Sequence, residues 1–338
     1  MPNIENKVKE ITNCSSGEIP DFVSTSNQPF ILKGLVDSWP IVKEGKKSPT
    51  DAAGYLRKLY NGRPVISAYG EPEIKGRVFY NEDMTGLNCQ GIKADLNIVL
   101  DKLLSHMEDP TPPTIYIAST SVDNWLPNFK QENKALLENL KPATNIWIGN
   151  QSKIAAHYDF PNNLAWCAVG KRRFTLFPPD QISNLYVGPM ELSPGGQDIS
   201  LVDFDNPDFD KFPKFKQAIK NAQIAELEPG DALFIPGMWW HHVKALNTFN
   251  VLVTHWWRDG KAFMGKPENA LKLAILSLRG LPSSQRKAWQ AIFNHYIFDQ
   301  NEGDFDHIPD KVKGMLSQTL DVNTAKKIRA ELLNKLKV

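Results

Sequence analysis

The chain of 338 residues carries 39 basic and 38 acidic side chains, which gives a formal net charge of +1 at pH 7. Hydrophobic residues make up 41% of the chain and charged residues 23%, as in ordinary globular proteins. This balance shows neither the basic excess typical of nucleic-acid-binding domains nor an acidic tail, and no run approaches the roughly 18 apolar residues that a membrane-spanning helix needs.

In the first 140 residues, periodic patterns predict helices set between short strands. Residues 1–28 show no clear period and are expected to run over the surface. A helix is expected at 48–60, where Thr50 is a candidate N-cap, and an amphipathic helix at 95–107, where leucines share one face. A short helix is expected at 130–140. Short apolar runs predict strands at 29–36, 63–69, 77–80 and 114–118.

From 145 to 258 the pattern is one of strands and turns. A Gly-Lys pair separates the apolar runs Leu164–Val169 and Arg173–Phe177, which predicts a hairpin. The segment 228–231, with proline and glycine at its centre, is typical of a type II turn. Further strands are expected at 232–235, 241–246 and 251–257. Many short strands separated by turns favour a mainly β fold, a double-stranded β-helix of the cupin or jelly-roll type with flanking helices.

Beyond Arg258 the pattern becomes helical. Apolar residues recur at helical spacing in three stretches, namely Leu271, Ile275 and Leu278; Trp289, Ile292, Phe293 and Tyr296; and Ile328, Leu332, Leu333 and Leu336. We therefore expect a cupin-like domain at 1–260 and a C-terminal helical segment at 261–338. The apolar stripes of this segment either pack on their own domain or form a subunit interface, which would make the protein a homodimer.

The three cysteines, Cys14, Cys89 and Cys167, are too few and too scattered for a disulfide framework or a cysteine-based zinc site. A reducing compartment is the expected setting for such a chain. The N-terminus also lacks the apolar core of a signal peptide. These features predict a cytoplasmic protein.

Two segments that lie far apart in the sequence carry residue types that bind metal. An apolar run predicted as a strand ends in His157-Tyr158-Asp159, and residues i and i+2 of a strand point to the same side. The second segment, residues 230–241, ends in His241. This histidine would complete a set of two imidazoles and one carboxylate. Such a set leaves coordination positions open, and non-haem Fe(II) oxygenases use it. His-x-Asp alone is weak support, because a histidine at a strand end beside an exposed aspartate gives the same pattern.

These segments resemble the JmjC-type, cupin-like family of 2-oxoglutarate- and Fe(II)-dependent dioxygenases. Residues 148–159 read Ile-Gly, six residues, then Ala-His-Tyr-Asp, and 230–243 read Gly-Asp-x-Leu-Phe-Ile-Pro-x-x-Trp-Trp-His-His-Val. The apolar opening at 29–40 resembles the family's N-terminal strand. The resemblance spans about 29–258 and extends to the asparaginyl hydroxylase that inhibits hypoxia-inducible factor and to its bacterial cupin-like relatives. The combined pattern is specific, whereas each half alone is only moderately so.

The resemblance implies a metal site and a catalytic role for the 1–260 domain. It assigns Fe(II) to His157, Asp159 and His241, with 2-oxoglutarate and O2 as co-substrates. It implies hydroxylation of a substrate C–H bond with release of succinate and CO2. His242 is expected to point to the opposite side of its strand, because strand residues alternate.

The resemblance also implies a basic residue that binds the far carboxylate of 2-oxoglutarate. The family pattern has a lysine at this position, and this sequence has Arg172, which suits the task because a guanidinium pairs with a carboxylate through two hydrogen bonds. Lys171 or Arg173 would serve instead if the strand register were shifted by one residue. A solvated basic turn is the alternative explanation of this cluster.

Further positions match the family's co-substrate pocket with varying fidelity. Asn163 and Tyr116 match residues that contact the co-substrate, and Trp257 matches a pocket tryptophan. Tyr116 and Trp257 would equally serve as barrel core. His255 stands where the asparaginyl hydroxylase has an asparagine, and Ile154 where it has a threonine that binds the co-substrate. The Ile154 departure removes one expected hydrogen bond.

Two other classes of function stay open at this point. A non-catalytic cupin-like module would keep the barrel and bind a metal or ligand without turnover. A Zn²⁺ hydrolase would use the same ligands for a different reaction. Among oxygenase substrates, a protein side chain is our first expectation, while an N-methyl group, a small molecule or a tRNA base stays possible. No sequence feature indicates a nucleic-acid or membrane partner.

Overall fold

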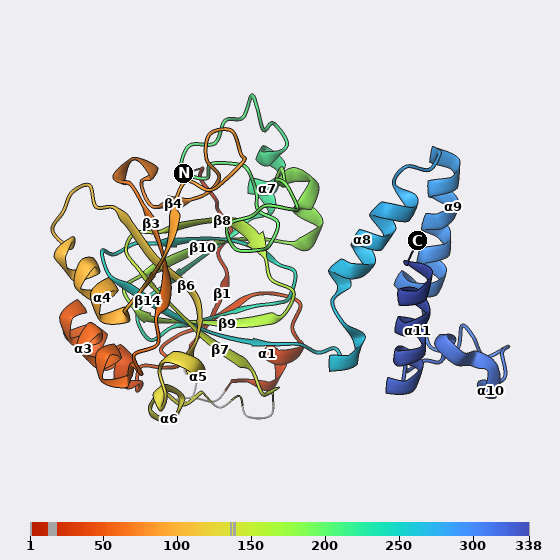
Figure 1. Ribbon diagram of the computed structural model, residues 1–338, viewed down its shortest axis with the longest axis horizontal. Coiled ribbons are helices and arrows are strands. Elements are labelled where there is room, and N and C mark those ends of the chain that lie inside the picture. The colour runs from red at the N-terminus through yellow and green to blue at the C-terminus, as the bar shows by residue number, and fades with distance from the viewer. Residues whose placement is uncertain (1, 13–18, 136, 138–139, 338) are drawn as a thin grey trace. The chain divides into compact units, whose positions relative to one another are not determined.

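The computed structural model describes residues 2–12, 19–135, 137 and 140–337. The chain divides into two units, Met1–Arg258 and Asp259–Val338, which are described one at a time (Figure 1). The helix predicted at 130–140 falls partly outside the described residues. Within them, a single helical turn, α6, covers Phe129–Glu132.

Strands dominate the first unit and form two sheets in the described part of the chain. The larger sheet has the order β1-β2-β12-β9-β14-β7-β6-β3-β5, and the smaller has the order β11-β10-β13-β8-β4. Their bounds are β1 Lys9–Ile11, β2 Phe30–Leu32, β3 Val65–Gly70, β4 Arg77–Val78, β5 Gln90–Ala94, β6 Thr114–Ser121, β7 Ala143–Gly149, β8 Lys153–Tyr158, β9 Asn162–Val169, β10 Arg172–Phe177, β11 Gln223–Leu227, β12 Ala232–Ile235, β13 Trp240–Ala245 and β14 Asn250–Trp257. The predicted mainly β, jelly-roll fold with flanking helices is confirmed.

Short helices flank the sheets of this unit. They are α1 Asp21–Thr25, α2 Pro40–Lys47, α3 Pro49–Leu59, α4 Leu96–Ser105, α5 Val122–Trp125, α6 and α7 Phe215–Asn221. The predicted cap of α3 was wrong: Ser48, not Thr50, accepts the hydrogen bond from the Asp51 amide. The reason is Pro49, which suits the first helical position and so sets the cap one residue earlier. Asp95 caps α4 in the same way.

The hairpin predicted across Gly170 does not form. Strand β9 pairs with β12 and β14, whereas β10 pairs with β11 and β13, so the chain crosses from one sheet to the other at this point. Gly170 has a φ of 72°, and a Cβ there would lie 2.4 Å from the Asn250 side chain. A positive φ with no room for a side chain explains the glycine. The same sequence signal therefore marks a turn between sheets instead of a turn within one.

Apolar side chains fill both the space between the sheets and the space under the helices. One cluster joins α2, α3 and α4 to the outer face of the larger sheet, with Leu56, Leu100 and Ile148 among its buried members. A second lies between the two sheets and includes Phe174, Leu233 and Leu252. The inner faces of the two sheets thus enclose the interior in which the site is built.

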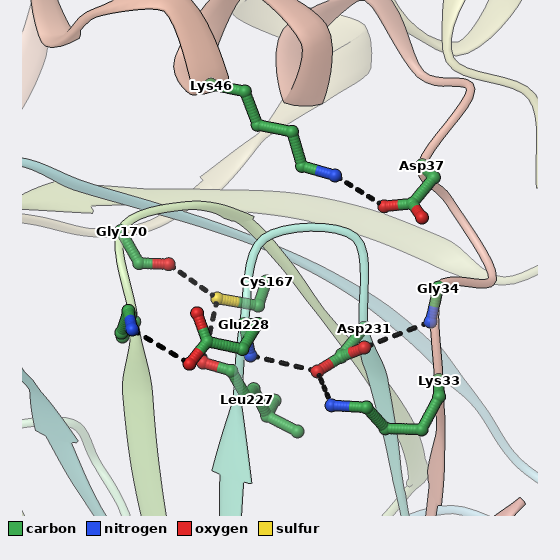
Figure 2. A network of polar contacts seen from close by, with 10 residues as sticks. Lys33, Gly34, Asp37, Lys46, Cys167, Gly170, Leu227, Glu228 and Asp231 are labelled. Atoms are coloured by element: carbon green, nitrogen blue, oxygen red, sulfur yellow. Dashed lines mark hydrogen bonds and ion pairs between the residues drawn. The ribbon is translucent and has the colours of Figure 1, made fainter. Parts of the chain in front are cut away.

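A buried carboxylate fastens the N-terminal segment to the barrel. Asp231 accepts hydrogen bonds from the Gly34 and Glu228 backbone amides, each at 2.9 Å, and pairs with the Lys33 ammonium at 2.5 Å (Figure 2). The Asp231 amide donates to the Glu228 carbonyl, and Gly230 has a φ of 109°, so the turn predicted at 228–231 is present. Burial of an aspartate is offset here by three hydrogen bonds. The Gly-Asp pair of the sequence motif therefore has a structural role.

The second unit is helical and carries little core of its own. Its main helices are α8 Pro267–Leu278, α9 Ser283–Phe293, α10 Asp310–Lys313 and α11 Val322–Lys335, and a π-helical turn at Asn294–Phe298 follows α9. Within the described residues, Phe305 is the buried hydrophobic side chain of this unit. The large apolar side chains that stay exposed include Leu276, Trp289, Ile297, Phe298, Leu333 and Leu336. Among the described residues, no helix combines the length and apolar character that crossing a membrane requires.

Candidate metal centre and its cavity

Three predicted ligands meet at one point in the barrel. His157 lies at the end of β8 directly opposite His241 on β13, and their ring centroids are 4.3 Å apart. Asp159 follows β8, and its Oδ2 lies 3.7 Å from Nε2 of His241. One ligand atom from each of the three residues lies within 4.8 Å of the other two. These residues can therefore bind one metal ion together.

Backbone carbonyls set the orientation of both imidazoles. Nδ1 of His157 lies 2.9 Å from the Ala155 carbonyl, and Nδ1 of His241 lies 3.0 Å from the Trp239 carbonyl. A carbonyl can only accept, so each Nδ1 carries the proton and each Nε2 keeps a lone pair for a metal. Burial, and after it the neighbouring His157, lowers the pKa of His241 to about 4. Neutral imidazole is the form that a metal requires, so this donor set fits a divalent ion such as Fe(II).

An irregularity in β8 brings more of that strand to the interior. The register between β8 and β13 shifts between the pairs His157–His241 and Ile154–Val243, which leaves two residues of β8 opposite one of β13. Bulges of this kind re-aim side chains and are common beside active sites. Ile154 lines the same cavity as His157 as a result. Its apolar side chain occupies a wall position where the resemblance predicts a hydroxyl.

The metal centre opens into a cavity of about 280 Å3 between the two sheets. Three of the predicted co-substrate residues, Tyr116, Asn163 and Arg172, line this cavity together with the ligands. Burial raises the pKa of the Tyr116 phenol far above its usual range, so the phenol remains a hydrogen-bond donor. Apolar side chains complete much of the wall, including Trp147, Phe174, Val243, Leu252 and Trp256. A mostly apolar cavity with a few convergent polar groups is the usual form of a ligand site.

Arg172 is a buried cation that faces this cavity. It is 2% exposed, and among the described residues its Nε has no hydrogen-bond partner and no carboxylate pairs with it. Burial lowers its pKa from the ordinary value. A buried charge without a counter-ion is costly, so an anionic ligand would be favoured beside it.

The two neighbouring basic residues point elsewhere. The exposed Lys171 pairs with Glu228 at 2.9 Å, and the half-buried Arg173 pairs with Glu226 at 2.5 Å. They lie outside the cavity, because alternate residues of a strand face opposite sides. The register of β10 thus selects Arg172 among the three candidates for the cavity wall.

The structure does not bring Trp257 or His255 to the cavity. Trp257 stacks on Phe234 at a centroid distance of 5.9 Å, within the cluster on the outer face of the larger sheet. His255 accepts a hydrogen bond from Trp166 on that same side. Trp256, between them, lines the cavity, and sequence reasoning missed it. The alternation along β14 was the signal that would have found it.

His242 also points away from the metal centre, as the strand period predicts. Its ring stacks on Phe204 at a centroid distance of 4.6 Å. Burial lowers its pKa to about 3. It is therefore a neutral side chain of the outer face of β13.

A further polar residue at the centre was not predicted. Gln197, from a loop, donates a hydrogen bond to Oδ1 of Asp159 at 3.0 Å and lines the cavity. No spacing or period in the loop sequence marks it. Only the folded chain shows the contact.

Comparisons with known proteins agree with this geometry. The family model described as Cupin-like domain matches residues 17–263. Relatives include lysine-specific demethylase 8 of Xenopus tropicalis, 26% identical over 249 residues, covering 70% of this chain and 49% of that protein. The tRNA wybutosine-synthesizing protein 5 of Danio rerio is 34% identical over 147 residues, covering 43% of this chain and 40% of that protein. Lysine-specific demethylase JMJ31 of Arabidopsis thaliana is 29% identical over 163 residues, covering 45% of this chain and 29% of that protein.

The matches thus span less than half the length of each of these relatives. The family model, in contrast, covers most of the chain and every barrel strand from β2 to β14. The chain belongs to the cupin-like (JmjC-type) domain family.

Proposed function

We propose that this protein is a 2-oxoglutarate- and Fe(II)-dependent oxygenase that hydroxylates a C–H bond of its substrate. The observation that carries the proposal is the convergence of His157, Asp159 and His241 on a cavity that also holds the buried Arg172. When bound, Fe(II) supplies the redox chemistry that couples oxidation of 2-oxoglutarate by O2, to succinate and CO2, with hydroxylation of the substrate. A set of two histidines and one carboxylate suits this chemistry because it leaves positions open.

The residues of the chain bind and orient the reactants. Arg172 pairs with the far carboxylate of 2-oxoglutarate. This carboxylate is then the counter-ion of the buried guanidinium. Tyr116 and Asn163 offer a hydroxyl and an amide to the same ligand from β6 and β9. The polar groups of the cavity therefore fix one orientation of the co-substrate.

The apolar wall excludes water from the reacting groups. Trp147, Phe174 and Leu252 face the cavity and offer a water molecule no charged partner. Ile154 has the same effect at the position where a hydroxyl was expected. Because the cavity is small, about 280 Å3, it suits a substrate that inserts a side chain or a comparably small group. A protein side chain is therefore the proposed substrate, and a small molecule is the alternative.

Hydroxylation of an ordinary C–H and demethylation of an N-methyl group share the same oxidative step. Two of the matched relatives are named as lysine-specific demethylases. We place simple hydroxylation first, since it is the step that both outcomes require. The two differ in product, because demethylation releases formaldehyde and hydroxylation leaves the oxygen on the substrate.

The test is succinate release, screened against peptide and metabolite pools, with mass spectrometry of each substrate. The expected result is substrate-dependent succinate release together with the gain of one oxygen atom in one pool member. A non-catalytic metal-binding module would bind Fe(II) without releasing succinate above the background of the Asp159→Ala variant. A Zn²⁺ hydrolase would keep its activity when O2 is removed.

We also propose that the helical unit pairs two copies of the chain. Its exposed apolar side chains on α9 and α11, including Trp289, Ile292, Leu332 and Leu333, support this, because isolated stripes of this kind favour burial in an interface. Removal of residues 265–338 should convert a dimer into a monomer in light scattering. A folded truncation that keeps the mass of a dimer would contradict the proposal.

A further inference from the structure

A loop at 188–197 contributes to the metal centre from outside the barrel strands. Pro194, Gly195 and Gln197 line the cavity, and the Gln197 amide donates to Oδ1 of Asp159 at 3.0 Å. We propose that Gln197 is a positioning residue that holds Asp159 as a one-oxygen metal ligand and, through this bond, fastens the loop against the cavity. The inference rests on the proposed function, because it concerns the same metal centre.

The two oxygens of Asp159 have different surroundings. Oδ2 lies 3.7 Å from Nε2 of His241, on the side where the ligand atoms converge. Oδ1 is occupied by the hydrogen bond from Gln197. A carboxylate that binds a metal through both oxygens takes one more coordination position than a carboxylate that binds through one. By holding Oδ1, Gln197 keeps that position available for co-substrate and O2.

The loop has anchors on both sides of its turn. On one side, the Tyr80 hydroxyl donates to the Leu192 carbonyl at 2.6 Å. On the other, Ile199 forms a bridge with His157, and the Ser200 amide donates to the Ala156 carbonyl at 2.7 Å. The chain therefore begins to pair with β8 only two residues after Gln197.

A glycine pair forms the turn between these anchors. Gly195 and Gly196 directly precede Gln197, and Gly196 has a φ of 83°, which side-chain-bearing residues rarely adopt. Ordering such a turn has a high entropic cost, because glycine loses more conformational freedom on ordering than other residues. The bond from Gln197 to Asp159 closes the turn onto the metal centre. Metal binding and ordering of the loop should therefore be coupled.

The test compares Fe(II) binding, measured anaerobically by calorimetry without 2-oxoglutarate, in three variants and the wild type. Outer-shell partners of metal ligands contribute about 10-fold to 100-fold in metal affinity, so Gln197→Ala should weaken Fe(II) binding by about 10-fold or more. Gln197→Glu keeps the shape of the side chain but cannot donate when ionised, and it should weaken binding similarly. Glu191→Gln, an exposed change in the same loop, is the control and should bind Fe(II) as the wild type does.

A second readout separates positioning from a general structural effect. Hydrogen exchange of the loop should slow when Fe(II) is added to the wild type and to Glu191→Gln, but not when it is added to Gln197→Ala. The proposal is overturned if Gln197→Ala binds Fe(II) as tightly as the wild type or retains the metal-dependent protection of the loop. Asp159→Ala separates the two proposals: if it still binds Fe(II) with wild-type affinity, the proposed function fails, whatever Gln197 does.

Discussion

The inner and outer faces of the barrel strands carry similar residues in opposite environments. His241 faces the cavity beside the two other proposed metal ligands, whereas His242 stacks on Phe204. Arg172 is buried in the cavity wall, whereas Arg173 pairs with Glu226 at the surface. The side of the pleat, and not the residue type, therefore decides which residue can take part in the chemistry.

This contrast supplies matched controls within the protein itself. The pairs His241/His242 and Arg172/Arg173 each place one member on the inner face and a chemically similar neighbour on the outer face. A substitution of the inner-face member should weaken metal or co-substrate binding. A substitution of its outer-face neighbour should leave that binding unchanged and lower only the stability of the fold. Equal effects at neighbouring positions would break the account of the two faces.

The largest contrast is expected between the two histidines of β13. His241→Ala removes one of the three proposed metal ligands and should reduce succinate release to background. His242→Gln should retain metal binding and turnover, with a lower midpoint of thermal unfolding, because it disturbs a buried ring contact. Fe(II) titration and succinate assays of both variants are the measurement. Loss of metal binding in both, with both proteins folded, would contradict the comparison.

The next contrast is expected at β10. Arg172→Met leaves the far carboxylate of 2-oxoglutarate without its cation, and loss of one partner of a buried charge pair costs about 2–5 kcal/mol. The KM for 2-oxoglutarate should therefore rise by roughly 30-fold or more, since about 1.4 kcal/mol corresponds to tenfold. Arg172→Lys should restore much of this, and Arg173→Met should leave the KM unchanged. If the KM for 2-oxoglutarate rises in Arg173→Met and not in Arg172→Met, the register of β10 is shifted by one residue from the observed one.

A smaller effect is expected from the histidines of the outer faces. Burial lowers the pKa of His242 and of His255 to about 3, while the unfolded chain takes up these protons near the ordinary value of 6.5. The lowered pKa means that stability is complete above about pH 6.5 and falls as the pH drops from there toward 3. Each group contributes about 1.4 kcal/mol per pH unit within this window.

Denaturant unfolding between pH 7.5 and pH 4 measures this dependence. His255→Asn should reduce the slope of the unfolding free energy against pH by about 1.4 kcal/mol per pH unit. This is the slope that corresponds to the uptake of one proton on unfolding. His307→Asn, at an exposed position, should leave the slope unchanged. An unchanged slope in His255→Asn would mean that this imidazole is protonated in the folded state.

The sequence predicted the fold well, and the three side chains that it proposed as metal ligands converge in the structure, because both depend on local signals. Strand β12 was placed at its observed bounds, since a Pro-Gly turn precedes it and an apolar run fills it. His157 and Asp159 were found from their i, i+2 spacing, and His241 from its motif. Arg172 was left open among three residues, because only the pairing of β10 fixes its register.

The parts that were missed depend on pairings between distant segments. The β9–β10 turn looked like a hairpin, yet the two strands belong to different sheets. Trp257 was assigned to the pocket where the structure has Trp256, a difference of one position along β14. Gln197 reaches Asp159 through a loop conformation that no period in the sequence encodes.

The most direct measurement is the visible absorption of the protein after anaerobic addition of Fe(II) and 2-oxoglutarate. If both bind at the centre formed by His157, Asp159 and His241, a charge-transfer band should appear in the wild type and be absent from Asp159→Ala. A wild-type protein that shows no such band, or an Asp159→Ala variant that shows it at full strength, would contradict the assignment of this centre.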